Sequence, residues 1–324
     1  MSTRSAPPGT TTLITTPTFA RFSPEPWRLL DEAGAGPLRP CPDAALPGAE
    51  LRERIAGVDA LIVGMDPVTA DVIAAADRLK VIAKHGVGVD TIDLAAARAH
   101  GIQVVCAPGS NSRAVAEFTF GLILDCARRI TASHEQVVRG GWPKLFGPEL
   151  AGRTLAVIGF GRIGRLLTGY ALAFGMRVIA HDPYVDAQDV AAQGARAASL
   201  DDCLAEADVV SLHLPADPSA GPLLDGRRLA ALKQGAILVN AARGGLVDET
   251  ALAKLLVDGH IGAAALDAFA GEPLGDSPLR TAPNVLLTSH MAACSQEANR
   301  DMGVMVTEDV IRVLAGETPL RPAV

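Results

Sequence analysis

Short apolar runs alternate with helix-length amphipathic stretches along most of the chain. In the first hundred residues the apolar runs are short and continuous, and such runs separated by helices are typical of a parallel sheet that is buried on both faces. Strands are expected at 13–16, 60–63, 80–83 and 103–106, and helices at 24–33, 69–76 and 94–100. This part of the chain predicts one complete α/β unit.

A second series of strands follows a single long helix, which is expected over 112–138 with Asn111 or Ser112 as its cap. Further strands are expected at 155–158, 177–180, 209–212, 236–239, 263–266 and 285–287, before a last helix at about 296–315. A doubly wound dinucleotide-binding domain contains such a set of parallel strands. The pattern therefore predicts an α/β fold with two sheets.

Composition and charge exclude several classes of protein. The 324 residues include 29 Lys+Arg and 36 Asp+Glu, a formal net charge of −7, and 49% are hydrophobic. This balance excludes a disordered chain and argues against nucleic acid or an anionic membrane as partner. No apolar run approaches the roughly 20 residues that span a bilayer. The five cysteines form no C-x-x-C pair and the polar N-terminus has no apolar signal core, which predicts a cytoplasmic protein. The histidines lack ligand spacing, so no metal is expected.

A glycine-rich turn, Gly159-Phe160-Gly161-Arg162-Ile163-Gly164, joins the predicted strand 155–158 to a helix. The first glycine allows a tight turn, the second lets a pyrophosphate approach the backbone, and the third lets helix and strand pack closely. The amides of Arg162 and Ile163 are expected to face the pyrophosphate. Asp182 ends the next strand about 20 residues on, where an acid binds the ribose hydroxyls and repels a 2′-phosphate. The turn predicts NAD rather than NADP.

Three ionisable residues lie near the ends of the later strands or in the loops that follow them. Arg243 follows the strand 236–239, Glu272 lies in the loop after 263–266, and His290 follows 285–287. Ligands of open α/β sheets bind at the carboxyl ends of the strands, so all three side chains are expected to converge on one site. Taken singly, each also fits an ordinary role as a surface charge or a polar strand end.

Several motifs accompany these residues in a fixed order. They are Lys84-His85-Gly86-Val87-Gly88-Val89-Asp90, Asn111-Ser112 with Val115-Ala116-Glu117, the glycine turn, Leu212-His213-Leu214-Pro215, Asn240-Ala241-Ala242-Arg243-Gly244, Ala265-Leu266-Asp267 and Ser289-His290. With them the chain resembles the D-isomer-specific 2-hydroxyacid dehydrogenases, and within these the phosphoglycerate dehydrogenase-like branch. The resemblance extends from about residue 69 to about residue 317.

The resemblance implies that Arg243, Glu272 and His290 are catalytic. Hydride transfer at a C2 carbon requires a proton to move on the C2 oxygen, and histidine suits this near neutral pH. A glutamate bonded to the other ring nitrogen would fix the tautomer and favour the imidazolium. Arginine offers a planar fork to the substrate carboxylate.

The resemblance also implies cofactor and substrate contacts. NAD contacts are expected from Leu214, Pro215, Ala241, Ala242, Asp267, Arg243 and His290, in addition to the glycine turn and Asp182. The substrate carboxylate is expected on the backbone amides of Val87 and Gly88 and on Arg243 and His290, with Lys84 as the contact of a second anionic group. His85 and Lys84 are expected to add positive charge. The alternative is that 86–88 is only a turn and that Lys84 is solvated.

The chain departs from the family pattern at three positions. Leu214 stands where many members have threonine, so only a backbone contact is expected there. Lys84 stands where several phosphoglycerate dehydrogenases have arginine, and Gly64 where some have a second arginine. These two changes weaken the case for a phosphate-bearing substrate, but they do not affect the reaction class.

The resemblance implies two Rossmann-like domains with a cleft between them. A discontinuous, flavodoxin-like substrate domain is expected over 1–108 and 292–324, and a doubly wound NAD-binding domain over 109–291. The long helix at 112–138 carries apolar residues on more than one face, and the resemblance implies a homodimer through the NAD-binding domains.

The expected activity is NAD-dependent oxidation of a D-2-hydroxy acid or the reverse reduction, with 3-phosphoglycerate or a similar phosphate- or phosphonate-bearing acid as substrate. The alternatives are a hydroxypyruvate or glyoxylate reductase and, in a different class, an NAD-sensing corepressor-like binding protein. A formate dehydrogenase is disfavoured, because that branch has glutamine in the motif that holds Glu272.

Overall fold

The computed structural model describes residues 5–38, 45–217 and 219–323, and within them the chain divides into two compact units. Unit 1 contains the residues up to Asn111 together with those from Cys294 onward, and unit 2 is Ser112–Ala293. The domain limits expected from the sequence, after residues 108 and 291, differ from these by three and two residues. Each unit is built around its own parallel sheet.

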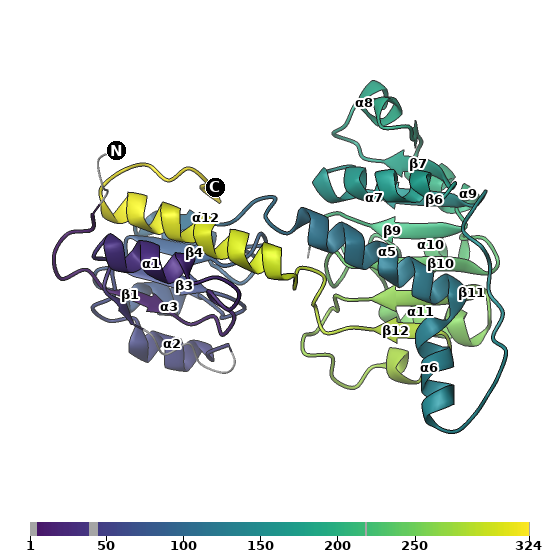
Figure 1. The fold of residues 1–324 in the computed structure, drawn as a ribbon, viewed down its shortest axis with the longest axis horizontal. Coiled ribbons are helices and arrows are strands. Elements are labelled where there is room, and N and C mark those ends of the chain that lie inside the picture. Colours follow the sequence, from purple (N-terminus) through teal and green to yellow (C-terminus); the bar gives the residue numbers. More distant parts are fainter. Residues whose placement is uncertain (1–4, 39–44, 218, 324) are drawn as a thin grey trace. The chain divides into compact units, whose positions relative to one another are not determined.

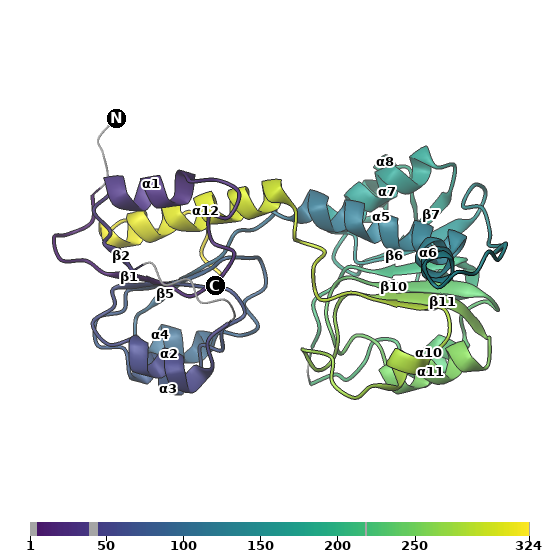
Figure 2. The ribbon, with the colours of Figure 1, turned by 60° about the horizontal axis from the view of Figure 1, so that its bottom comes forward.

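Unit 1 contains a five-stranded parallel sheet in the order β2-β1-β3-β4-β5. Its strands are β1 (Thr12–Ile14), β2 (Pro37–Leu38), β3 (Ala60–Val63), β4 (Val81–Lys84) and β5 (Gln103–Val105). Its helices are α1 (Glu25–Glu32), α2 (Gly48–Arg54), α3 (Ala70–Ala74), α4 (Leu94–Ala99) and α12 (Gln296–Leu314). Helices α1 and α12 cover one face of the sheet, and α2, α3 and α4 cover the other (Figure 2). This strand order is that of a flavodoxin-like sheet.

The last residues of the described chain return to the sheet of unit 1. Pro322 pairs with Val105 in antiparallel orientation, and the Ala323 N–H donates to the Val104 carbonyl over 2.8 Å. Arg321 anchors this segment to α12, because its guanidinium contacts the buried Asp309 carboxylate at 3.1 Å. The segment therefore covers part of the open edge of β5.

Unit 2 contains a seven-stranded parallel sheet in the order β12-β11-β10-β9-β6-β7-β8. Its strands are β6 (Thr154–Ile158), β7 (Arg177–His181), β8 (Arg196–Ala197), β9 (Val209–Leu212), β10 (Ala236–Asn240), β11 (Ile261–Leu266) and β12 (Val285–Leu287). Its helices are α5 (Ser112–Arg128), α6 (Ile130–Val138), α7 (Arg162–Ala173), α8 (Ala187–Ala192), α9 (Leu200–Glu206), α10 (Gly226–Ala230), α11 (Glu249–Val257) and the 3-10 turn η1 (Pro278–Thr281). Helices α5 and α7 lie on one face, and α10 and α11 on the other (Figures 1 and 2). The predicted α/β class is confirmed.

Both faces of the unit 2 sheet are buried, as the continuous apolar runs predict. All five residues of β6 are buried. Leu155 and Val157 pack into the hydrophobic cluster that includes Phe120 of α5. Ala156 and Ile158 point to the opposite face and into a second cluster. This alternation fixes the register of β6 and therefore the place where the glycine-rich turn begins.

The single long helix predicted over 112–138 is wrong, because two helices occupy this stretch. The chain breaks at Arg129, which has φ 56 in the left-handed region. The Asp125 carboxylate accepts the N–H of Thr131 at 2.7 Å and so binds a free donor at the start of α6. A polar cap inside an amphipathic pattern therefore divides the predicted helix.

Among the described residues, no helix combines the length and the apolar character needed to cross a membrane. The described cysteines, Cys106, Cys126, Cys203 and Cys294, form no disulfide with one another, and Cys41 lies outside the described residues.

Candidate active site

The glycine-rich turn connects β6 to α7 in a geometry that requires glycine at two of its positions. Gly159 has φ 96, and a Cβ built on it would lie 2.5 Å from the His213 carbonyl oxygen. A Cβ on Gly164 would lie 2.9 Å from the Val157 side chain, so this glycine lets α7 pack closely on β6. Arg162 and Ile163 form the start of α7, where the first backbone N–H groups have no partner within the helix. This cradle fits a pyrophosphate.

Asp182 is held against the glycine-rich turn. One of its carboxylate oxygens accepts the Phe160 N–H at 2.8 Å, and the other accepts the Tyr184 N–H at 2.9 Å. The carboxylate is therefore fixed beside the turn, and its oxygens keep lone pairs that can accept ribose hydroxyls. Leu214-Pro215 and Ala241-Ala242 follow β9 and β10 at the same edge of the sheet.

The loop after β10 is organised by the side chain of Asn240, which is 1% exposed. Its Nδ2 donates to the Arg243 carbonyl at 2.8 Å, and its Oδ1 accepts the Ala242 N–H at 3.2 Å. The Arg243 Nη1 donates to the Ala242 carbonyl at 2.8 Å. Asn240 thus fixes the turn that carries Arg243.

The structure brings His290 and Glu272 together in a hydrogen-bonded pair. The His290 Nδ1 lies 2.8 Å from Glu272 Oε2 and 3.0 Å from Oε1, and Oε1 also accepts the Phe269 N–H at 2.9 Å. The His290 side chain remains 40% exposed. With Nδ1 bonded to the carboxylate, the imidazole can offer Nε2 to a substrate. Such a pair can donate and accept a proton.

The loops that carry Arg243 and Glu272 pack directly on one another. A Cβ built on Gly244 would lie 2.7 Å from the Ala270 nitrogen and closer still to the Phe269 carbonyl. The Ala270 N–H is in turn bonded by Glu249 at the start of α11 at 2.7 Å. Glycine at 244 therefore lets the two loops touch.

Asp267 lies beneath the His290 loop and is 1% exposed. Its carboxylate accepts the Thr288 hydroxyl at 2.6 Å and the N–H groups of Met291 and Ala292, both at 2.8 Å. A contact of Asp267 with the nicotinamide stays a prediction. Neither Asn240 nor Thr288 was assigned a role from the sequence, although both are polar residues at the carboxyl ends of strands.

The sequence pattern of the D-isomer specific 2-hydroxyacid dehydrogenase NAD binding domain matches residues 120–292. The chain belongs to this family. The expectation of NAD as cofactor is therefore confirmed, and the cradle at 159–164 fits it.

This chain is 45% identical over 271 residues to the D-3-phosphoglycerate dehydrogenase of Mycobacterium tuberculosis, covering 83% of this chain and 51% of that protein. It is 41% identical to the hydroxypyruvate reductase of Thermotoga maritima, covering 82% of this chain and 88% of that protein. The crystal structure of the TT0316 protein from Thermus thermophilus matches it with a TM-score of 0.87 and 37% identity, over 97% of this chain and 100% of that one. The chain spans about half the length of the D-3-phosphoglycerate dehydrogenase that it matches.

The motif around Lys84, which the resemblance assigns to the substrate, lies in unit 1. Lys84 ends β4 and is buried, and its ammonium donates to the Gly64 carbonyl and lies 3.4 Å from the Thr91 hydroxyl. Val87 and Gly88 follow in the next loop and are partly exposed. Their expected contacts with substrate stay predictions.

His85 does not add the positive charge expected beside Lys84. Burial lowers the pKa of His85 to about 4, so its ring is neutral at pH 7. Burial and the neighbouring positive charge of Lys84 both disfavour the imidazolium, and the depth of burial could not be predicted from the sequence.

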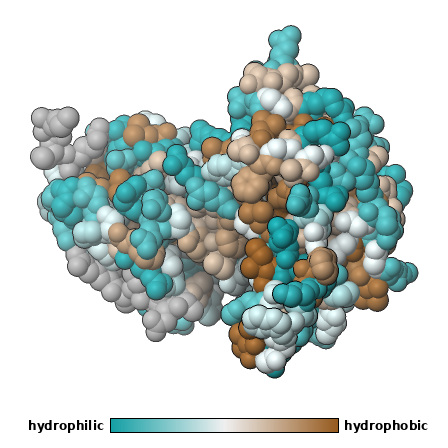
Figure 3. Space-filling view, turned by 45° about the vertical axis from the view of Figure 1, so that its right-hand side comes forward, coloured by the Kyte–Doolittle hydropathy of each residue, from teal (hydrophilic) through white to brown (hydrophobic). Residues whose placement is uncertain are grey.

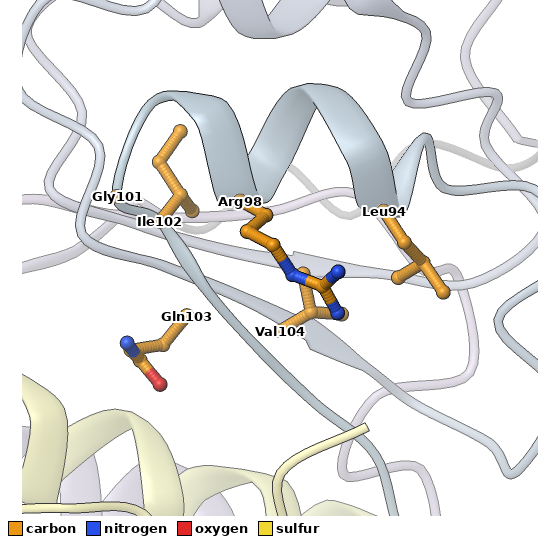
Figure 4. Close-up of a pocket in the computed structure, with 6 residues that line it drawn as sticks. All are labelled: Leu94, Arg98, Gly101, Ile102, Gln103 and Val104. Atoms are coloured by element: carbon orange, nitrogen blue, oxygen red, sulfur yellow. The ribbon is translucent and has the colours of Figure 1, made fainter. Parts of the chain in front are cut away.

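Unit 1 also contains a cavity of about 170 Å³ between α4 and β5 (Figure 4). It is lined by Leu94, Arg98, Gly101, Ile102, Gln103 and Val104. None of these six residues belongs to the candidate site.

Proposed function

We propose that the protein is an NAD-dependent D-2-hydroxyacid dehydrogenase. The observation that carries the proposal is the bond between His290 and Glu272, at 2.8 Å, beside the loop of Arg243 in a domain of the NAD-binding family. Bound NAD supplies the hydride acceptor in oxidation, and NADH the donor in reduction. The residues of the chain move the proton and bind the substrate carboxylate.

The proton moves on the C2 oxygen through His290. In oxidation His290 Nε2 would accept the proton of the C2 hydroxyl, with bound NAD as the acceptor of the hydride from C2, and in reduction the imidazolium would return a proton to the C2 oxygen. Glu272 on Nδ1 fixes the tautomer and favours the charged ring. Arg243 binds the substrate carboxylate and polarises the C2 carbonyl.

We propose 3-phosphoglycerate, or a similar phosphate- or phosphonate-bearing acid, as the substrate. The similarity to D-3-phosphoglycerate dehydrogenases supports it, and a hydroxypyruvate or glyoxylate reductase is the alternative that the Thermotoga relative supports. On this proposal, the amides of Val87 and Gly88 bind the carboxylate, and Lys84 binds the second anionic group. A charge-assisted hydrogen bond of this kind contributes about 10- to 100-fold in affinity.

Oxidation of NADH with a panel of 2-oxo acids tests the function and the substrate together. The expected result is a higher kcat/KM for the phosphate-bearing acid than for hydroxypyruvate or glyoxylate, and Lys84→Met should remove this preference. Lys80→Met, which removes a half-exposed lysine from the same region, is the matched control. Higher kcat/KM with hydroxypyruvate would favour the reductase. NADH binding without turnover of any acid would refute the dehydrogenase and indicate a corepressor-like protein.

We also propose that the protein is a cytoplasmic homodimer that associates through unit 2. No residue of α6 is buried, and the segment after it exposes Trp142 by 79% and Phe146 by 87%. Hydrophobic residues are visible among the hydrophilic ones on the molecular surface (Figure 3). Tryptophan and phenylalanine are enriched at protein interfaces, and the four described cysteines form no disulfide with one another, which supports a reducing compartment.

Light scattering at micromolar concentration tests the association. We expect the mass of a dimer for the wild type and of a monomer for Trp142→Ser/Phe146→Ser. Phe22→Ser removes a half-exposed phenylalanine from unit 1 and should leave the dimer intact. A monomeric wild type would contradict the proposal.

A further inference from the structure

The buried carboxylate of Asp267 holds both sides of the loop that carries His290. Thr288, two residues before the histidine, donates its hydroxyl to Oδ1 at 2.6 Å. Met291 and Ala292, directly after it, donate their N–H groups to Oδ1 and Oδ2 at 2.8 Å. The segment 288–292 is therefore fixed on the two sides of the proton-transferring residue.

His290 needs such support because of its backbone conformation. Its φ of 53 lies in the left-handed region, which residues other than glycine rarely adopt. A strained residue keeps this conformation only where the surrounding contacts impose it. If the N–H groups of Met291 and Ala292 lost their acceptor, the backbone could relax and the imidazole would turn away from Glu272.

The hydroxyl of Thr288 is separable from the strand that precedes it. The Thr288 N–H donates to the Leu266 carbonyl at 3.0 Å, so the backbone pairing of this residue does not use the side chain. The hydroxyl lies 2.6 Å from Asp267 and 3.4 Å from the Leu266 carbonyl. The shorter contact, to a charged acceptor, is the stronger one.

We propose that Thr288 is a positioning residue for His290. Its hydroxyl orients the Asp267 carboxylate, the carboxylate holds the N–H groups of Met291 and Ala292, and these keep the His290 Nδ1 on Glu272. The catalytic consequence rests on the proposed function, because it assumes that His290 transfers the proton. The effect on the position of the His290 ring does not depend on that assumption, and it can be measured in the protein without cofactor or substrate.

The first measurement is made on the cofactor-free protein. In ¹⁵N-histidine-labelled wild type, NMR should show a downfield Nδ1 proton bonded to a carboxylate, which His290→Asn assigns by its loss. Thr288→Val keeps the shape of the side chain but removes the hydroxyl, and the signal should disappear or move upfield. Thr288→Ser keeps the hydroxyl and should retain the signal. If Thr288→Val does not fold, Thr288→Ala gives the same comparison.

The second measurement is turnover. Misplacement of a catalytic group by about 1 Å costs about 100-fold, so Thr288→Val should lose about 10- to 100-fold in kcat with little change in the Kd of NADH. Thr288→Ser should restore kcat. An unchanged Nδ1 signal and an unchanged kcat in Thr288→Val would overturn the proposal. If even the wild type turned over no 2-oxo acid, the proposed function would fail, and the NMR comparison would still decide the positioning role.

Discussion

Replacement of Gly244 by alanine should abolish most of the proposed activity without unfolding the protein. The added Cβ would lie 2.7 Å from the Ala270 nitrogen and closer still to the Phe269 carbonyl, whereas Cβ contacts below 3.0 Å essentially never occur. Both of these groups belong to the backbone, so the loops must move apart. The Phe269 N–H also donates to Glu272 at 2.9 Å, so movement of Phe269 should carry Glu272 away from His290.

The size of the effect follows from the displacement. The loops must separate by about 1 Å, and a misplacement of that size costs about 100-fold in rate. We expect kcat to fall by about this factor. The Kd of NADH should change less, because the contacts expected from the glycine-rich turn and Asp182 follow other strands and keep their places.

Steady-state turnover and NADH fluorescence titration measure the two quantities. Gly271→Ala is the matched control in the same pair of loops, because a Cβ there would have no atom within 4 Å and its φ is not in the left-handed region. The control should keep near wild-type kcat. A folded Gly244→Ala enzyme with kcat within about threefold of the wild type would show that loop contact does not set the catalytic geometry, because a real displacement costs far more.

Three further predictions concern the cofactor, the proton and the stability. Asp182→Ala should narrow the preference for NAD over NADP, and an unchanged ratio of kcat/KM values would show that the acid does not bind the ribose. His290→Ala should lower kcat by about 10²–10⁴ with NADH affinity nearly intact. Glu272→Gln keeps a hydrogen bond to the ring but removes the charge that favours the imidazolium, so the rate of reduction should decline with rising pH at a lower pH than in the wild type. Burial lowers the pKa of His85 to about 4 in the folded protein. Between pH 6.5 and pH 4 the histidine is therefore protonated mainly in the unfolded chain, and the free energy of unfolding decreases as the pH falls through this range. Urea unfolding should show that the wild type loses about 2 kcal/mol more than His85→Gln between pH 7 and pH 5, and equal losses would contradict the burial argument.

The sequence predicted those elements of the fold that depend on one local property, the continuous run of apolar residues. Continuous apolar runs identified the long strands of both sheets, because strands buried on two faces have no polar side. The strands β2 and β8 were missed, since each has only two residues and too short an apolar signal. The break at Arg129 was missed because it depends on the Asp125 side chain bonding Thr131, a contact that an amphipathic pattern does not reveal.

The residues of the candidate site could be predicted from the sequence, but most of the hydrogen bonds between them could not. Glu272 and His290 were identified because polar residues at the ends of parallel strands converge, and the structure places them in hydrogen-bond contact. The bonds of Asp267 reach residues more than twenty positions away, and no spacing rule indicates them. The neutral state of His85 was equally unreadable, since it depends on how deeply the ring is buried.

The discontinuity of unit 1 has a consequence for the order of folding during synthesis. Unit 2 is one uninterrupted stretch, complete when residue 293 has left the ribosome, whereas the sheet of unit 1 must wait for α12 to cover α1 and β4. Domains usually fold in the order in which they are made. Here the part that is translated first is completed last, and a chain truncated after residue 293 and released from the ribosome should show a protease-sensitive unit 1 and a protected unit 2.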